Sequence, residues 1–189
     1  MRILAISGSL RRDSHNTALL RAAAALLPPE VELIIHDGLD EIPPYNDDTL
    51  DSAPGPVERL REEVEAADAV LISTPEYNSS IPGQLKNALD WLSRPLPTSP
   101  LRNKPTAVVG ASTGMFGAVW AQAEVRKVLG AIGARTLDHE LPLAAAHEQF
   151  TLDGRLLDRE VEQQLLAVLD ELVQAVRNRT ATSANAPVG

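Results

Sequence analysis

The chain contains no cysteine, and only 3% of its 189 residues are aromatic. Without thiols it has no disulfides, thiolate nucleophiles, iron–sulfur clusters or dithiol redox motifs. Any redox chemistry must therefore come from a bound cofactor. The four histidines are scattered without metal-ligand spacing, so we predict no metal site.

Basic charge and long hydrophobic runs are also scarce. The net charge of -9 argues against a general nucleic-acid binder, because a phosphate backbone requires a basic surface. It does not exclude a single bound phosphate, since a local nest of donors can oppose the overall field. No apolar run reaches transmembrane length, and the first residues lack the pattern of a signal peptide. We therefore expect a cytoplasmic protein with no membrane or nucleic-acid partner.

Short apolar runs alternate with segments of helical periodicity. The alternation predicts a single α/β domain over residues 1–177, with a doubly wound, five-stranded parallel sheet and helices on both faces. The composition of residues 178–189 predicts a flexible C-terminal tail. The expected strands are 2–6, 31–35, 69–74, 106–111 and a more polar fifth within 136–143, and the expected helices are 17–27, 57–66, 84–92, 118–132 and 158–177.

A polar loop, residues 7–17, follows the first expected strand. A phosphate needs several converging donors, and the start of a helix supplies them from backbone N–H groups. A capped turn is the alternative, with Ser14 or Asn16 as the N-cap. Only Gly8 is a glycine here and no Lys-Ser or Lys-Thr pair follows, so neither a dinucleotide fingerprint nor a P-loop fits. The candidate phosphate ligands are Ser9, Arg11, Ser14, Asn16 and Thr17.

Two further loops follow the third and fourth expected strands. Residues 75–83 include Tyr77, which has the area to pack against a flat ring. The alternative is that the prolines here only end a strand and start a helix. Small residues at 110–117 allow a ligand to approach the backbone closely. Phe116 and Trp120 either shield a pocket or belong to the core or an interface. Loops at the carboxyl ends of parallel strands share one crevice, so a phosphate site beside a ring site suggests flavin mononucleotide (FMN).

Three segments, 8–16, 74–94 and 112–114, resemble the NAD(P)H-dependent FMN reductases, a flavodoxin-like family that includes bacterial quinone, chromate and azo-dye reductases. The similarity spans roughly residues 2–177. It implies a flavodoxin-like fold and bound FMN, with NADPH or NADH as co-substrate. The five phosphate candidates keep that role by resemblance. The residues implied at the flavin ring are Pro75, Glu76, Tyr77 and Asn78 on one side and Ser112, Thr113 and Gly114 on the other.

The resemblance also implies an activity and an assembly. We expect ping-pong hydride transfer from NAD(P)H to quinones, flavins, azo dyes or metal oxyanions, with no side chain acting as a catalytic acid or base. We expect a homodimer or homotetramer, with the helix at 84–93 and its Trp91 at the interface. Asp13, His15 and Phe116 depart from the family pattern at positions where they can alter flavin affinity.

Two other functions are compatible with the same residues. One is a flavodoxin-type electron carrier, which holds FMN but does not turn over with nicotinamide coenzymes. The other is a flavin-free regulatory or scaffold domain that keeps only the fold.

Overall fold

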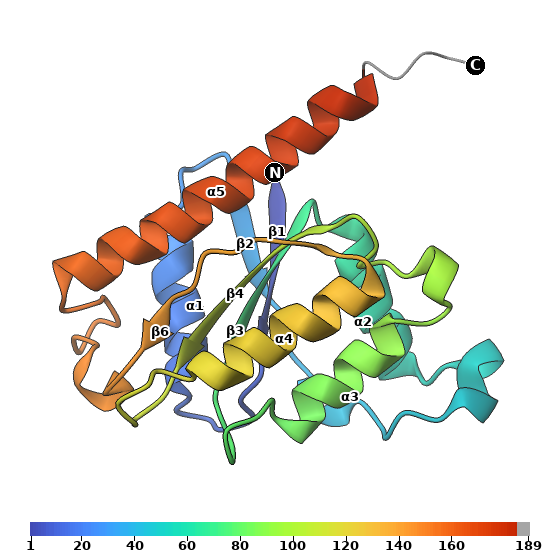
Figure 1. The fold of residues 1–189 in the computed structure, drawn as a ribbon, viewed down its shortest axis with the longest axis horizontal. Coiled ribbons are helices and arrows are strands. Elements are labelled where there is room, and N and C mark those ends of the chain that lie inside the picture. The colour runs from blue at the N-terminus through green and yellow to red at the C-terminus, as the bar shows by residue number, and fades with distance from the viewer. Residues whose placement is uncertain (185–189) are drawn as a thin grey trace.

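Strands and helices alternate along the chain in the computed structural model, which describes residues 1–184, with side chains described as far as Ala181 (Figure 1). The strands are β1 (Arg2–Ser7), β2 (Glu32–Ile35), β3 (Ala69–Thr74), β4 (Pro105–Ala111), β5 (Arg135–Thr136) and β6 (Pro142–Leu143). The α-helices are α1 (His15–Leu26), α2 (Gly55–Ala66), α3 (Gly83–Leu92), α4 (Val119–Ile132) and α5 (Arg159–Ala184).

The strands form one parallel sheet in the order β2-β1-β3-β4-β5. This is the flavodoxin-like order, so the predicted fold class is confirmed. The fifth position differs from the expected single strand. β5 pairs with the start of β4 and β6 with its end, while the polar stretch 138–140 between them leaves the sheet.

The sheet separates two hydrophobic cores. Helices α1 and α5 pack on one face, and α2, α3 and α4 pack on the other (Figure 1). Alternate residues of the central strands serve the two cores: Ile3 and Leu71 face α1 and α5, whereas Leu4 and Ile72 face the other helices. Burial on both faces explains why these strands are apolar along their whole length.

Trp91 belongs to the core of its own chain. Its side chain is about 1% exposed, and its indole N–H donates to the carbonyl of Pro43 over 2.9 Å. The Tyr45 ring meets it edge-on, with 5.1 Å between ring centroids. The expectation that Trp91 itself lies at a subunit interface is therefore wrong, whereas the expectation that the helix at 84–93 borders an interface stays a prediction. Through its hydrogen bond to Pro43, Trp91 instead connects the inner face of α3 to the loop before α2.

Helix α5 continues beyond its predicted end at 177 and runs to Ala184. Its apolar face, which includes Leu165, Leu169 and Leu172, is buried against α1 and the sheet. Residues 185–189 of the expected tail lie outside the described residues. None of the helices within residues 1–184 combines the length and apolar character needed to cross a bilayer.

Candidate functional site

The loops after β1, β3 and β4 meet around a hollow of about 120 Å³ at the carboxyl edge of the sheet. Nine of the twelve residues predicted for the site line it: Ser9, Arg11, Ser14, Asn16, Pro75, Glu76, Tyr77, Ser112 and Thr113. We call this space the inner hollow. Two further residues, His15 and Ala111, complete its lining.

Three predicted residues lie outside this lining. The Thr17 hydroxyl donates to the Ser7 hydroxyl over 2.9 Å and lines a neighbouring hollow instead. Asn78 is at the exposed tip of its loop, with a left-handed φ of 53°. Gly114 is exposed, and its N–H donates to the Ser112 hydroxyl.

The start of α1 offers free donors beside the inner hollow. The Ser14 hydroxyl accepts from the Thr17 N–H over 3.2 Å, so Ser14 is the N-cap of α1. Of the two residues considered for this cap, Ser14 and Asn16, it is therefore Ser14 that fills it. Among the described residues, the backbone N–H groups of His15 and Asn16 have no acceptor. Unpaired N–H groups and the positive end of the helix dipole together suit an anion such as a phosphate ester.

The Asn16 side chain has a structural role. Its Nδ2 donates to the Ala111 carbonyl over 2.9 Å, and its Oδ1 accepts from the Ala111 N–H and the Ser73 hydroxyl. The residue is only 3% exposed. Its amide is therefore committed to joining α1 to β3 and β4, whereas its backbone N–H remains available to a ligand.

Two side chains set the charge of the inner hollow. The Arg11 guanidinium has no ion-pair or hydrogen-bond partner within the described part of the chain, so it is free to bind an anion. His15 stacks on Phe150 at 6.3 Å, with the two rings nearly parallel. Partial burial lowers the pKa of His15, and the positive charges of Arg11 and His147 lower it further. A bound dianion would oppose the repulsion between these cations.

The loop after β3 is a rigid turn. Tyr77 and Ser80 exchange backbone hydrogen bonds of 3.2 and 3.1 Å around Asn78 and Ser79, which both have positive φ. Glu124 on α4 accepts from the Ser80 hydroxyl and the Ile81 N–H and so anchors the turn. The anchor keeps the Tyr77 side chain, which is 50% exposed, at the mouth of the site.

Glu76 has a role that the sequence did not reveal. Its Oε2 accepts from the N–H groups of Trp120 and Ala121 over 3.0 and 3.1 Å. Glu76 thus caps α4, whose own N-cap position holds Ala118 and provides no side-chain acceptor. A carboxylate at this end also complements the helix dipole. This cap connects the loop after β3 to the loop after β4, because α4 begins where the loop after β4 ends.

A more apolar hollow of about 410 Å³ adjoins the first, and we call it the outer hollow. The two share Arg11 and Tyr77. Gly8 lies in its floor, where a Cβ would come within 2.9 Å of Leu85 Cδ2 and 3.2 Å of Pro75 Cδ. The donor-rich inner hollow fits a phosphate, and the adjoining apolar surface with Tyr77 fits a flat ring. The residues present therefore fit FMN.

Fold and site together define a flavodoxin-like mononucleotide-binding protein. The profile of one family, described as NADPH-dependent FMN reductase, matches residues 1–148. The chain belongs to this family.

Full-length relatives support the assignment. An NAD(P)H-dependent FMN reductase of Pseudomonas aeruginosa is 44% identical over 182 residues, covering 94% of this chain and 97% of the relative. A 2-hydroxy-1,4-benzoquinone reductase of a Burkholderia species is 34% identical, covering 95% and 98%. The solved structure of FerB, a flavoenzyme NAD(P)H:(acceptor) oxidoreductase from Paracoccus denitrificans, aligns with a TM-score of 0.83 and 35% identity over 94% of this chain and 97% of FerB. The protein is therefore an oxidoreductase with FMN as cofactor and NAD(P)H as co-substrate.

The Glu76 cap makes a prediction for stability. We expect Glu76→Ala to lower the free energy of unfolding by about 1–2 kcal/mol, because two N–H groups at the start of α4 lose their acceptor. Glu76→Gln keeps an acceptor oxygen and should lose less. Urea denaturation measures both, with Glu148→Ala as the control at an exposed carboxylate. Equal stability of Glu76→Ala and wild type would show that the cap contributes nothing.

Proposed function

We propose that the protein reduces quinones at the expense of NADPH or NADH, with both substrates using the same open face of the site in turn. The observation that carries this proposal is the donor-rich inner hollow beside an apolar outer hollow whose rim is exposed. Leu10 and Tyr77 on that rim are 55% and 50% exposed, so a planar molecule can enter and leave freely.

Bound FMN would supply the redox chemistry, taking two electrons from the coenzyme and delivering them to the acceptor. The chain's own residues would bind and orient. The start of α1 and Arg11 would hold the phosphate, and the turn after β3 would border the ring. Loop residues Ser112 and Thr113 would close the opposite side of the inner hollow. No side-chain proton donor is assigned: hydride transfer from the coenzyme requires none, and the proton needed to form the hydroquinone would come from water at the exposed rim.

The acceptor range follows from the open rim. A quinone is favoured because the relative from Burkholderia is a benzoquinone reductase and because the outer hollow is apolar. Free flavins, azo dyes and metal oxyanions are secondary acceptors in this proposal, since an exposed face discriminates poorly between acceptors of similar potential.

Anaerobic mixing tests the proposal. We expect NADPH or NADH to bleach the visible absorbance of the FMN-loaded protein, and 1,4-benzoquinone to restore it. Dithionite serves as the control for a reducible flavin. Bleaching by dithionite but by neither coenzyme would identify an electron carrier, and failure of the protein to bind added FMN would favour a scaffold domain.

We also propose that the protein forms a homodimer through an apolar patch beside the site. Met115, Phe116 and Trp120 are 78%, 55% and 46% exposed, and the last two pack edge-on at 4.9 Å. Exposed apolar clusters of this kind mark interaction surfaces. The Glu76 cap holds Trp120 beside the loop that carries Tyr77, so a second copy seated here would border the substrate-binding face.

The dimer proposal predicts an effect of charge at the patch. We expect Trp120→Glu to shift the mass from light scattering after size exclusion toward that of one chain, because a buried carboxylate opposes association. Leu152→Glu is the matched control, since Leu152 is fully exposed on another loop. A wild-type protein that is already monomeric at high concentration, or a Trp120→Glu variant that remains dimeric, would contradict the proposal.

A further inference from the structure

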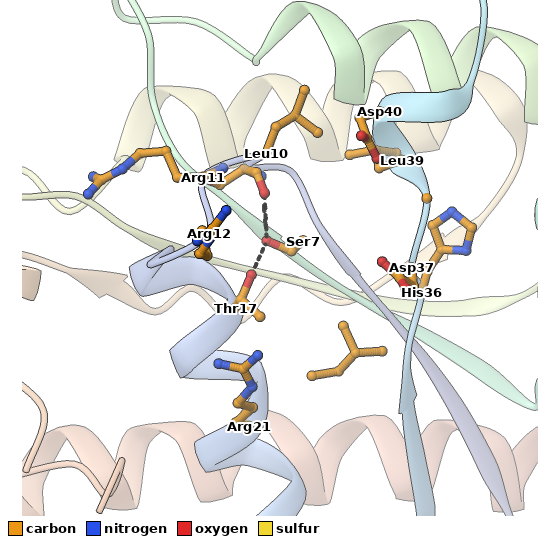
Figure 2. Close-up of a pocket in the computed structure, with 13 residues that line it drawn as sticks. Ser7, Leu10, Arg11, Arg12, Thr17, Arg21, His36, Asp37, Leu39 and Asp40 are labelled. Atoms are coloured by element: carbon orange, nitrogen blue, oxygen red, sulfur yellow. Dashed lines mark hydrogen bonds between the residues drawn. The ribbon is translucent and has the colours of Figure 1, made fainter. Parts of the chain in front are cut away.

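A second polar hollow, of about 400 Å³, lies between α1 and the end of β2 (Figure 2). We call it the edge hollow. The loop after β1 separates it from the site described above: Ser9 and Arg11 line both the edge hollow and the inner hollow, and Leu10 and Arg11 line both the edge hollow and the outer hollow. One extended ligand can therefore contact the edge hollow and the flavin site together.

The two walls of the edge hollow carry opposite charges. Arg12 and Arg21 lie on the α1 side, and Asp37 and Asp40 lie on the β2 side, while the Arg11 side chain extends away from the space (Figure 2). Between the walls, the Thr17 and Ser7 hydroxyls are joined at 2.9 Å. The end of β2 is held in place because His36 Nδ1 bonds Glu63 on α2 over 2.6 Å.

Within the described part of the chain, three of these charged side chains have no direct polar partner. No ion pair or hydrogen bond engages the side chains of Arg12, Arg21 or Asp37 there. Other arginines of the chain, such as Arg2 and Arg59, do form ion pairs with carboxylates. Unpaired guanidinium groups facing unpaired carboxylates across a hollow are suited to a ligand that carries both anions and hydroxyls.

We propose that the edge hollow binds the phosphorylated adenosine ribose of NADPH, an inference that rests on the proposed function. Arg12 and Arg21 would bind the 2′-phosphate, because guanidinium groups bind phosphate oxygens in pairs. Asp37 would accept from the 3′-hydroxyl of the same ribose, the hydroxyl that stays free when the 2′ position is phosphorylated. The nicotinamide end would then cross the loop at Leu10 and Arg11 to reach the flavin site.

Size and chemistry favour this ligand over FMN itself. A volume of 400 Å³ lies at the lower end of the range of about 300–1,000 Å³ typical of small-molecule sites, which suits part of a dinucleotide. The FMN phosphate is better served by the free N–H groups at the start of α1, because the one acidic residue lining the inner hollow, Glu76, uses its carboxylate to accept from the N–H groups of Trp120 and Ala121. Asp37 and Asp40 would repel a dianion that offered them no hydroxyl.

Binding of adenosine 2′,5′-bisphosphate to the FMN-loaded protein, measured by calorimetry, tests the assignment without turnover. We expect wild type to bind it more tightly than 5′-AMP. Arg12→Ala and Arg21→Ala should each weaken binding about tenfold, the loss expected for one charge-assisted contact. Arg135→Ala, which removes an exposed arginine at the opposite edge of the sheet, is the matched control. In steady-state assays, Arg12→Ala and Arg21→Ala should each raise KM for NADPH and leave KM for NADH, kcat and FMN content unchanged.

The assignment would be overturned by no binding of the bisphosphate, by binding that is insensitive to both arginines, or by displacement of the probe by FMN. Equal affinity for 5′-AMP and the bisphosphate would also contradict the assignment, since the 2′-phosphate would then contribute nothing to binding. These outcomes are separable from failure of the reductase proposal. Arginine-dependent binding without bleaching by NADPH would overturn the reductase activity alone, and bleaching without such binding would overturn this site alone.

Discussion

The hydrogen bonds of the Asn16 side chain fix the geometry on which the site depends. A single buried amide joins the first turn of α1 to Ser73 on β3 and to both backbone groups of Ala111 on β4, with distances of 2.8–3.0 Å. Because those three elements carry the three loops of the site, the amide sets the spacing between them. It also holds the start of α1 so that its free N–H groups border the inner hollow. An unmet partner in such a buried network would be costly.

A group of positive side chains lies near the carboxyl edge of the sheet. The chain as a whole is acidic, yet Arg11, Arg12 and Arg21, which have no ion-pair partner among the residues that the structure describes, gather around the first loop and the adjoining hollow. Together with the N-terminal end of α1 they make the carboxyl edge of the sheet attractive to phosphates. Carboxylates elsewhere are put to structural use: Glu76 caps α4, and Glu124 anchors the turn after β3. The overall charge thus says little about the ligand.

Patterns local in sequence predicted most of the fold, whereas contacts between distant residues were hidden. Uniformly apolar runs identified the central strands. The three loops of the site were then predicted because each directly follows one of these strands. The Glu76 cap was missed because its partners are about 44 residues away. Trp91 was misplaced because the family resemblance points to a helix near a subunit boundary but not to which of its side chains face the core. The fifth strand was predicted as one segment within 136–143 because the sequence does not show that β5 and β6 pair separately with the two ends of β4.

The central claim is that the protein recognises its cofactor by the phosphate ester held at the start of α1. Titration of the FMN-free protein with FMN and with riboflavin, which differs only in lacking the phosphate, tests this claim most directly. With two or more charge-assisted hydrogen bonds to the phosphate, the account predicts that riboflavin binds at least about 100-fold more weakly than FMN, and that Arg11→Ala narrows the difference. Equal affinities for the two flavins would contradict it.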